Sequence, residues 1–521
     1  MYRLRNKNAS QAGGHILKIG IDLGTTNSAV AYVNENDVAE IVMNSEGERT
    51  TPSVILMEGE KAIVGEVAKE AAAVQFDDTI QFVKRQIGNP SFQVPIQGLD
   101  RMIGAVEASA IILKKLVQDA ELELSEEITD VVITVPAYFD DAKRNATIEA
   151  AELIGLNVLK IINEPTAAAL AYYHLDKEKQ NQNIAVYDLG GGTFDVSIVN
   201  IEDNAIEVLS TDGDAYLGGF DFDNFIIEYV VDQFEEKTGI DLYDDDEALQ
   251  ELREDAERCK KSLSRRDKYV IRVSSGGHRE SIEVTKDSFQ DLISNLLDRT
   301  KIVMDATINE ANLTWEDIDK VLLVGGSTRV PMIEDMIKDL TGITPSKELN
   351  PDEVVALGAA VQASLIETDD DETISPKKKI VVKDVNSHSL GTITFSNEKK
   401  KLINSIILHK NTVIPHSTAR TYYTMHDNQE RLDLEITEGE DEDPDYVNII
   451  GKSTLELPEG LPKDSPLEIE ISYDKNGIVQ AVARDVTNNV ELGEIVIERE
   501  SILTQIEKEE LRDDLLNIEV E

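Results

Sequence analysis

Apolar residues follow two different periods along the chain, and the change of period divides it into two parts. In the first part, apolar runs typical of strands buried on both faces alternate with segments whose apolar residues recur at helical spacing. Residues 128–135 (ITDVVITV) form such a run, and residues 106–121 carry apolar side chains on one helical face. Residues 142–154 repeat the helical pattern, and residues 158–162 repeat the apolar run. Strands that alternate with helices predict an α/β domain, which we place at residues 16–366.

The second part consists of short, regularly spaced β-rich runs. It follows residues 367–379 (ETDDDETISPKKK), a charged stretch without apolar periodicity, and we place the interdomain linker at residues 367–383. Short strands separated by hairpin turns predict an all-β sandwich at residues 384–500. The predicted strands are residues 391–395, 402–408, 420–425, 431–437, 451–457, 467–473, 478–484 and 494–498.

The two ends of the chain are predicted to carry little structure. Residues 1–15 (MYRLRNKNASQAGGH) are basic and polar and lack the apolar stretch of a signal peptide, so we expect a disordered tail. An organelle transit segment is the alternative, although it would be unusually short. Residues 501–521 are expected to carry one short charged helix, over residues 502–517. No apolar run of about eighteen residues occurs, which argues against a membrane-spanning helix and a membrane partner.

The charge balance limits the possible partners. The 521 residues include 101 acidic and 51 basic side chains, for a net charge of −50. Such a surface repels phosphate backbones, so nucleic acid is not an expected partner. One cysteine excludes an internal disulfide and fits a reducing compartment, and we expect a cytoplasmic location. The seven histidines show no close metal-ligand spacing, so no histidine-based metal site is predicted.

A glycine-tipped hairpin occurs twice in the α/β part. In GIDLGTTNSAV (residues 20–30) and YDLGGGTFDVSIV (residues 187–199), an apolar strand leads into Asp-Leu-Gly, a glycine and threonine tip, and a second apolar strand. Glycine tolerates positive φ and has no side chain, so backbone N–H groups can approach an anion closely. Two such tips facing each other would hold a polyphosphate, and Asp22, Asp188 and Asp195 would orient Mg²⁺. This arrangement suits ATP.

Single residues elsewhere are open to more than one interpretation. Gly451-Lys452-Ser453 is not a P-loop, because Tyr446 stands where its first glycine belongs. Lys84, in FVKRQIG, is on its own most simply an exposed charge. Glu164 precedes a proline at a predicted helix start, where a carboxylate is most simply a cap favoured by the helix dipole.

Two further stretches carry candidate nucleotide contacts. Residues 247–264 predict an amphipathic helix in which Cys259 is a small buried residue. Its polar stripe is by itself most simply an exposed, salt-bridged face; it consists of Glu257, Lys260, Lys261 and Ser264. Residues 319–324 predict a strand that leads into a glycine turn, Gly325-Gly326-Ser327-Thr328-Arg329, and then a helix start, an arrangement that suits nucleotide contact.

Taken together, the motifs closely resemble those of the DnaK-type seventy-kilodalton heat-shock chaperones. The resemblance covers residues 16 to about 500. It is carried, in the family's order, by GIDLGTTNSAV, TVPAYF, INEPTAAALAY, VYDLGGGTFDVSIV, LLVGGSTRVPMI and NPDEVVALGAAVQ. Several other ATPases share the hairpins but not the whole series. The resemblance implies an actin-like ATPase domain with duplicated RNase H-like halves, followed by the β-sandwich.

The resemblance also implies roles for individual residues. Catalysis would involve Lys84, which positions the attacking water, together with Asp22, Glu164, Thr193 and Asp195. Mg²⁺, held largely through water, would be ordered by Asp22, Asp188 and Asp195, with K⁺ as a second cation. The phosphates and adenosine of ATP or ADP would be bound by Gly24, Thr25, Thr26, Asn27, Asp188, Gly190, Gly191, Gly192, Glu257, Lys260, Lys261, Ser264, Gly325, Gly326, Ser327, Arg329 and Asp352.

In such chaperones the sandwich binds extended apolar segments of unfolded proteins. Phe395, Leu432 and Leu434 match positions that line the peptide cleft. Pro136, Arg144 and Asp384 match positions that couple the domains. The implied partners are unfolded peptides, a J-domain co-chaperone and a nucleotide exchange factor, in protein folding and the stress response. The implied function is an ATP-dependent chaperone in which slow ATP hydrolysis controls peptide affinity.

The chain departs from the family pattern at four places. It ends after one short helix, so no helical lid is expected, and peptide release would then be fast. Lys383 stands where the linker usually carries an apolar residue, which affects the expected coupling to the J-domain and between domains. Thr392 replaces a larger apolar residue at the peptide cleft. The segment from Lys84 to Val106 is shorter than in many members.

Two other functional classes remain open. A lidless regulatory protein would use ATP as a switch and engage one specific folded partner. A sugar kinase of actin-like fold is disfavoured, because residues 384–500 form a separate β module and no sugar pocket is evident in the sequence.

Overall fold

The computed structural model describes residues 17–97, 101–175, 181–202, 204–366, 380–495, 497 and 505–521. The predicted tail at residues 1–15 and the charged stretch 367–379 lie outside these residues. Among the described residues, no helix has the length and apolar character needed to span a lipid bilayer.

A six-stranded sheet forms the centre of lobe 1, by which we mean residues 17–175. Its strand order is β11-β10-β1-β2-β3, with β4 paired to β2. β10 runs parallel to β1 and β11, whereas β2 returns antiparallel to β1, as the first glycine hairpin predicts. The strands are β1 (Lys18–Asp22), β2 (Asn27–Val33), β3 (Ala39–Val42), β4 (Thr51–Pro52), β10 (Asp130–Val135) and β11 (Asn157–Asn163). Helices α2 (Ala105–Leu124) and α3 (Asp141–Leu153) contribute to its apolar core.

A smaller sheet lies beside it, with the order β28-β6-β5-β7. It contains β5 (Ile55–Glu58), β6 (Lys61–Val64), β7 (Thr79–Ile80) and, from the far end of the chain, β28 (Glu519–Val520). The remaining elements of lobe 1 are α1 (Glu66–Ala71), η1 (Phe76–Asp78), η2 (Val83–Arg85), β8 (Gln93–Pro95) and β9 (Met102–Gly104).

Lobe 2, residues 181–341, contains a second sheet whose first strands are ordered β17-β12-β13-β14. Here too a parallel strand, β17, flanks an antiparallel hairpin, β12 and β13. The strands are β12 (Gln182–Leu189), β13 (Phe194–Glu202), β14 (Ala205–Asp214) and β17 (Lys320–Val324), with a separate hairpin of β15 (Lys268–Ser275) and β16 (His278–Thr285). The helices are α5 (Gly219–Thr238), η3 (Leu242–Asp244), α6 (Asp246–Leu263), α7 (Lys286–Glu310), η4 (Trp315–Asp317), η5 (Gly326–Arg329) and α8 (Pro331–Thr341).

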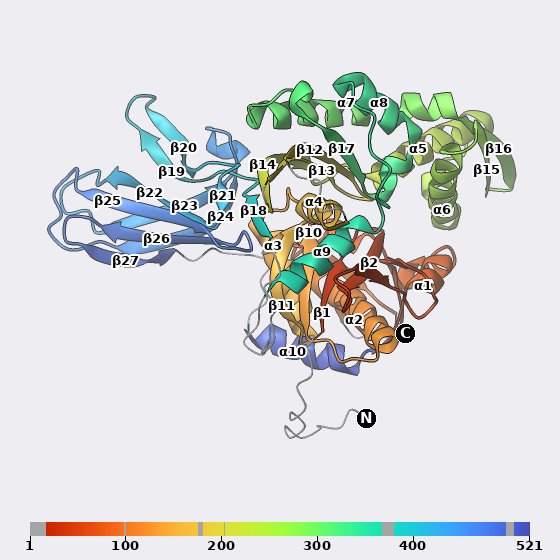
Figure 1. Cartoon of the computed structure of the whole chain (residues 1–521), viewed down its shortest axis with the longest axis horizontal. Helices are drawn as coiled ribbons and strands as arrows, with labels where there is room; N and C mark the ends of the chain where they lie inside the picture. Colours follow the sequence, from red (N-terminus) through yellow and green to blue (C-terminus); the bar gives the residue numbers. More distant parts are fainter. Residues whose placement is uncertain are drawn as a thin grey trace.

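Helices α4 (Glu164–Leu175) and α9 (Val354–Leu365) lie between the two sheets (Figure 1). They pack closely because their contact faces are rich in alanine and glycine. A Cβ on Gly358 would lie 1.8 Å from the backbone oxygen of Ala167, and one on Gly20 of β1 would lie 2.1 Å from the Ala360 nitrogen. Glycine at these positions therefore sets how close α9 comes to α4 and β1.

The β-rich part forms two four-stranded sheets around one apolar core, ordered β20-β19-β23-β24 and β22-β25-β26-β27. The predicted last strand, residues 494–498, begins too late: β27 lies at Val490–Ile495, because the turn at residues 486–489 sets its pairing with β26. Residues 496 and 498 lie outside the described residues. The elements are β19 (Leu390–Ser396), β20 (Lys401–Leu408), β22 (His416–Tyr423), β23 (Arg431–Glu438), η6 (Pro444–Tyr446), β24 (Asn448–Glu456), β25 (Pro466–Tyr473), β26 (Val479–Asp485) and β27.

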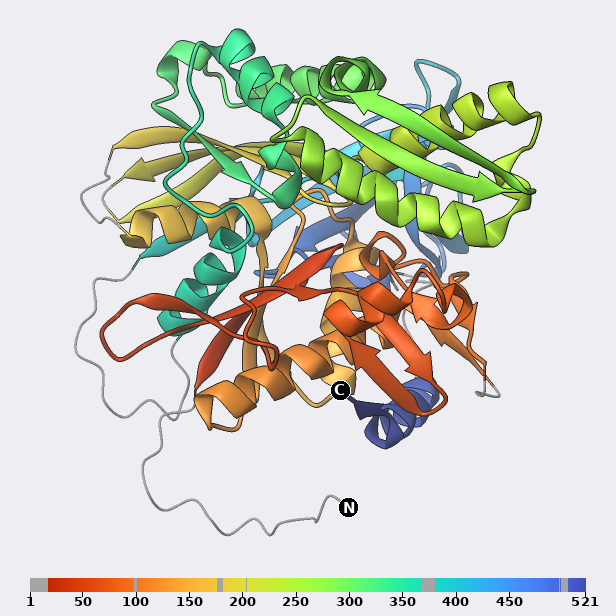
Figure 2. The ribbon, with the colours of Figure 1, turned by 90° about the vertical axis from the view of Figure 1, so that its right-hand side faces the viewer.

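Strand β18 (Val381–Val385) joins the sandwich to lobe 2. It pairs in parallel with β14 and antiparallel with β21 (Val413–Ile414), so residues 381–383 of the predicted linker lie in a sheet. Helix α10 (Gln505–Asn517) and β28 return to lobe 1, where Figures 1 and 2 show the blue helix beneath it.

Candidate functional site

The two glycine hairpins face each other at their tips. A Cβ on Gly191 would lie 2.5 Å from Cγ2 of Thr26, and one on Gly192 would lie 2.7 Å from Cγ2 of Thr25. A side chain at either glycine would therefore collide with the opposite tip. The absence of side chains lets two backbones from different lobes approach each other closely.

Hydroxyl groups hold the first hairpin in shape. The Gly24 N–H donates to Ser28 Oγ at 3.1 Å, and Ser53 Oγ donates to the Gly24 oxygen at 2.8 Å. The Ser53 N–H in turn donates to the Thr26 oxygen at 2.9 Å. In the second hairpin, Ser327 Oγ donates to the Gly190 oxygen at 2.7 Å. Ser53 and Ser327 thus fix the backbone of the two tips through hydrogen bonds.

The tips lie in a cleft of about 2110 Å³ that is lined by both lobes. Gly192 is adjacent to the lining residues Gly191 and Thr193, and Asp195 is buried, with the Tyr138 N–H donating to its Oδ1 at 2.9 Å. The other predicted ATP-site residues all line the cleft: Asp22, Gly24, Thr25, Thr26, Asn27, Lys84, Glu164, Asp188, Gly190, Gly191, Thr193, Glu257, Lys260, Lys261, Ser264, Gly325, Gly326, Ser327, Arg329 and Asp352.

Lys84 and Glu164 form a buried ion pair in the cleft. Lys84 Nζ lies 2.5 Å from Glu164 Oε1, and both residues are less than a tenth exposed. Burial alone would lower the pKa of Lys84, but the charges of Glu164 and Asp22 outweigh it and the net pKa is raised. The ammonium is therefore charged. Neither residue is the exposed charge or simple helix cap that its local sequence suggests.

The carboxylates around Lys84 fit a hydrated divalent cation. Burial, followed by the charge of Glu164, raises the pKa of Asp22 and of Asp195 to about 7, and raises that of Asp188 well above its ordinary value. Asp188 Oδ2 and Asp195 Oδ2 are buried without a hydrogen-bond partner. Among the described residues, no three acidic, histidine or cysteine side chains converge into a direct ligand set. Mg²⁺ held through its own water molecules would fit these acids, because Mg²⁺ keeps several waters.

Helix α6 forms one wall of the cleft. Glu257 lies between two lysines, 2.8 Å from Lys69 Nζ of lobe 1 and 2.9 Å from Lys261 Nζ. Burial alone would raise the pKa of Glu257, but the two ammonium groups outweigh it and lower it to about 2. Lys260 Nζ lies 2.6 Å from Asp223 Oδ2, while Ser264 Oγ donates to the Lys260 oxygen of its own helix. The polar stripe therefore forms a charged wall of the cleft. The ion pair between Glu257 and Lys69 reaches from this wall to lobe 1.

The glycine turn after β17 also lines the cleft. Gly325 has φ +84°, and a Cβ there would lie 2.3 Å from the Leu189 oxygen, so this turn requires glycine. Arg329 lies at the end of the turn, with Nη2 2.5 Å from Asp352 Oδ2 and 2.9 Å from Asn350 Oδ1. The turn and Asp352 are thereby joined at one edge of the cleft.

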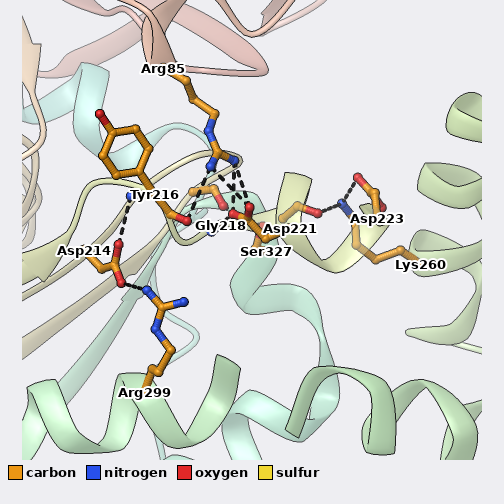
Figure 3. Close-up of polar contacts among 11 residues, drawn as sticks. Arg85, Asp214, Tyr216, Gly218, Asp221, Asp223, Lys260, Arg299 and Ser327 are labelled. Atoms are coloured by element: carbon orange, nitrogen blue, oxygen red, sulfur yellow. Dashed lines mark hydrogen bonds and ion pairs between the residues drawn. The ribbon is translucent and has the colours of Figure 1, made fainter. Parts of the chain in front are cut away.

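Sequence reasoning missed an ion pair that joins the two lobes (Figure 3). Arg85 Nη1, from η2 of lobe 1, lies 3.1 Å from Asp221 Oδ2 at the start of α5. The Arg85 guanidinium also lies 4.6 Å from the ring centroid of Phe220. A second pair, Arg299 with Asp214, lies within lobe 2. Nothing in the local pattern separates Arg85 from an ordinary exposed cation, apart from its position next to Lys84.

The three predicted coupling residues lie where lobe 1 meets β18. Arg144 Nη2 donates to Asn163 Oδ1 at 2.7 Å, and Asn163 Nδ2 donates to Asp384 Oδ1 at 2.9 Å. Thr166 Oγ1 donates to the other oxygen of Asp384 at 3.0 Å. Pro136 is buried at the end of β10. Asn163, which the sequence analysis did not single out, therefore links Arg144 to Asp384.

The three predicted peptide-binding residues differ in accessibility. Phe395 is 41% exposed, Leu432 is half-buried, and Leu434 is 4% exposed within the sandwich core. The Thr392 hydroxyl is also buried and donates to the Glu435 oxygen at 2.9 Å. Of the three, Phe395 presents the most surface to a ligand.

Comparison with known protein families adds one finding to this geometry. A family model described as Hsp70 protein matches residues 18–520. The match includes both lobes, the cleft between them, β18, the sandwich and α10. The chain therefore belongs to the Hsp70 family.

Proposed function

We propose that this protein is an ATP-dependent chaperone that hydrolyses ATP in the cleft and binds extended apolar segments of unfolded proteins in its sandwich. Members of the Hsp70 family are ATPases, and the family suggests chaperone activity. The observation that carries the proposal is the meeting of two glycine tips beside a buried, charged Lys84 and four acidic side chains.

Hydrolysis of a terminal phosphate needs positioning and charge neutralisation more than covalent help from the protein. We propose that backbone N–H groups of the tips contact the phosphates and that the Lys84 ammonium holds the attacking water. Glu164 keeps that ammonium charged and fixes it at 2.5 Å. Mg²⁺, when bound, would neutralise phosphate charge, with Asp22, Asp188 and Asp195 acting on its waters.

We assign adenosine to the outer half of the cleft. Helix α6 supplies polar side chains to the cleft, and the turn from Gly325 to Arg329 supplies a glycine backbone. The pairs made by Glu257 and by Arg329 with Asp352 pre-organise those side chains, so less conformational entropy is lost on binding.

The remaining parts of the proposal rest on the resemblance to the heat-shock chaperones and on the strand orders of the two central sheets. We infer that the two lobes are copies of one RNase H-like unit, because each sheet combines an antiparallel hairpin with a parallel neighbour. The proposal also includes a bound K⁺ ion and two partners, a J-domain co-chaperone and an exchange factor. It places the protein in the stress response and in the cytoplasm.

The test is ATP turnover by the full chain, measured as phosphate release with and without an unfolded peptide and a J-domain protein. We expect slow turnover that the peptide and the J-domain protein accelerate. Tight nucleotide binding without any acceleration would favour the regulatory ATP switch instead. A failure to bind adenine nucleotides would refute both.

A further inference from the structure

A short strand near the end of the sequence is added to the edge of the small sheet in lobe 1. β28 runs parallel to β6, with Glu519 opposite Lys61. The Glu519 N–H donates to the Glu60 oxygen at 3.1 Å, the Glu521 N–H donates to the Ala62 oxygen at 2.9 Å, and the Val64 N–H donates to the Glu521 oxygen at 2.9 Å. Backbone groups at the edge of β6 are thus paired by residues from the opposite end of the sequence.

The helix before this strand is anchored by two apolar side chains. Leu515 is 2% exposed and Ile518 is 4% exposed, and both belong to the apolar core of lobe 1. Leu516, on the other face of α10, is 72% exposed. Lys114 Nζ of α2 donates to the Leu515 and Ile518 oxygens at 2.7 and 2.8 Å. Lys114 thereby satisfies carbonyl groups that the end of a helix leaves without partners.

Ion pairs surround this apolar anchor. Arg101 Nε lies 3.0 Å from Asp514 Oδ2, and Lys61 Nζ lies 2.8 Å from Glu521 Oε2. At the other end of α10, Lys508 Nζ lies 2.8 Å from the buried Glu149 of α3. Apolar, backbone and charged contacts therefore all place residues 505–521 at one position on lobe 1.

The sheet that receives β28 also carries groups of the nucleotide cleft. β6 leads into α1, whose Lys69 reaches Glu257 across the cleft. β7 leads towards Lys84, and β5 follows Ser53, which supports the first glycine tip. The strands of this sheet are therefore joined through short chain segments to the lobe 1 side of the cleft.

The same segment is joined to the sandwich. β27 ends at Ile495 and α10 begins at Gln505, so α10 follows the sandwich in the chain and returns to lobe 1 separately from β18. The sandwich also contacts lobe 1 directly: the Val479 N–H donates to Asp141 Oδ1 at 2.9 Å, and the Ile161 N–H donates to Asn476 Oδ1 at 3.3 Å.

We propose that α10 and β28 form an interdomain clasp, in which strand addition to β6 fastens the sandwich to lobe 1 and stabilises the lobe 1 edge of the nucleotide cleft. The fastening of the sandwich is independent of the proposed ATPase function. The effect on the cleft rests on that function.

Amide hydrogen exchange of the full chain without nucleotide tests the fastening. In the double variant Leu515→Asp with Ile518→Asp, we expect exchange at the Val64 amide to accelerate at least about tenfold. The docking amides of Ile161 and Val479 should accelerate as well. Leu516→Asp places the same charge on the exposed face of α10 and should leave all three amides unchanged.

A second variant avoids the lobe 1 core. Glu521→Pro removes the N–H that pairs with the Ala62 oxygen, and it should accelerate exchange at Val64 while the strands of the large sheet stay protected. Unchanged exchange at Val64 in both variants would overturn the clasp. Faster exchange at Val64 with unchanged Ile161 and Val479 would also overturn it, because the segment would then only cap lobe 1.

Nucleotide release tests the effect on the cleft. A fluorescent ADP analogue should dissociate about threefold or more faster from the double variant than from Leu516→Asp. Equal dissociation rates would overturn the effect on the cleft. If the unaltered chain binds no ADP, the proposed ATPase function fails, while the exchange experiment still decides whether the sandwich is fastened.

Discussion

Lys84 owes its charge at the centre of the cleft to its neighbours. An isolated lysine this deeply buried would tend to lose its proton, because burial disfavours the charged form. Glu164 at 2.5 Å and the nearby Asp22 reverse that tendency and raise the pKa of Lys84. A fixed positive charge at this position suits the developing negative charge of phosphoryl transfer.

We therefore expect Lys84→Met to lower single-turnover ATP hydrolysis by about 100- to 1,000-fold while ATP still binds. This change leaves Glu164 buried and unpaired, which could also lower stability. The double variant Lys84→Met with Glu164→Gln removes the unpaired charge, so it separates a loss of catalysis from a loss of stability. We expect it to be as inactive as Lys84→Met. Lys268→Met, which alters an exposed lysine, is the control. More than half of the normal rate in both Lys84 variants would contradict the assignment.

At the scale of elements, the cleft depends on contacts between segments distant in sequence. η2 contacts α5 through Arg85 and Asp221, α1 contacts α6 through Lys69 and Glu257, and α9 packs between the sheets. The first two contacts span the opening between the lobes, so they resist its widening. The packing of α9 sets the distance between the central sheets of the two lobes.

Removing the Arg85 guanidinium should speed nucleotide release. We expect Arg85→Gln to raise the ADP dissociation rate about three- to tenfold, because a partly buried ion pair across the cleft is lost. Asp221→Asn should act similarly, and the double variant should add little, since both changes break one contact. Arg299→Gln is the matched control, because its pair with Asp214 lies within lobe 2. Equal release rates in Arg85→Gln and Arg299→Gln would exclude a role for Arg85 in holding the cleft.

Close packing of α9 should be sensitive to a single methyl group. Gly358→Ala would place a Cβ 1.8 Å from the backbone oxygen of Ala167, and a backbone cannot rotate away as a side chain can. We expect the free energy of unfolding in urea to fall by about 3 kcal/mol. Ser364→Ala, at a half-buried position of the same helix, should change it by less than about 0.5 kcal/mol. Similar stability of the two variants would show that the helices separate at little cost.

At the scale of the whole molecule, the sandwich is docked on both lobes. On lobe 2, Lys410 Nζ lies 2.6 Å from Glu310 Oε1, and the Thr211 N–H donates to Asn411 Oδ1 at 3.0 Å. On lobe 1, Glu438 of β23 is buried against α3, and its Oε2 has no hydrogen-bond partner. The docked state thus buries the Glu438 carboxyl group close to the acidic residues Asp140 and Asp141.

The contribution of Glu438 to docking should weaken as pH rises. Burial, followed by the charges of Asp140 and Asp141, raises the pKa of Glu438 well above its ordinary value of 4.5. The charge of Arg144 and a hydrogen bond from the Asp141 backbone oppose this shift, and Tyr473 also faces the carboxyl group. The docked state therefore binds more protons than the undocked state. Its stabilisation is complete below the ordinary pKa of Glu438 and is lost as pH rises towards the raised pKa.

Exchange at the Val479 amide, corrected for the intrinsic effect of pH and followed from about pH 5 to 8, measures this docking. Glu438→Gln keeps the shape of the side chain without its charge, so we expect docking at the upper end of this range to be tighter than in the unaltered chain. The same pH dependence in Glu438→Gln as in the unaltered chain would assign the effect to another group.

Much of the architecture could be predicted from short stretches. The hairpins at residues 20–30 and 187–199, the helix at residues 247–264 and most strands of the sandwich are found close to where their patterns place them. These patterns work because glycine tips, apolar periods and turns act through neighbours within a few residues. The last strand begins four residues earlier than predicted, because the turn at residues 486–489 fixes where β27 starts.

Other features could not be predicted from local pattern. Lys84 and Glu164 taken singly suggest an exposed charge and a cap, and only the motif series indicated a site there. Arg85 gave no sign of its partner Asp221, and Leu434, matched to a peptide cleft, lies in the sandwich core. In each case the role depends on which distant residue the fold brings alongside.

The sequence by itself determined the repeated glycine hairpins, the change from α/β to β-rich pattern, and the motif series that marks the family. Only the tertiary structure decided that the tips meet, that Lys84 is buried and charged, and that β28 joins the sheet of β6. The physical reason is the range of the forces involved. Backbone conformation and apolar period are set by near neighbours in the chain, whereas burial, ion pairing and strand addition depend on neighbours in space.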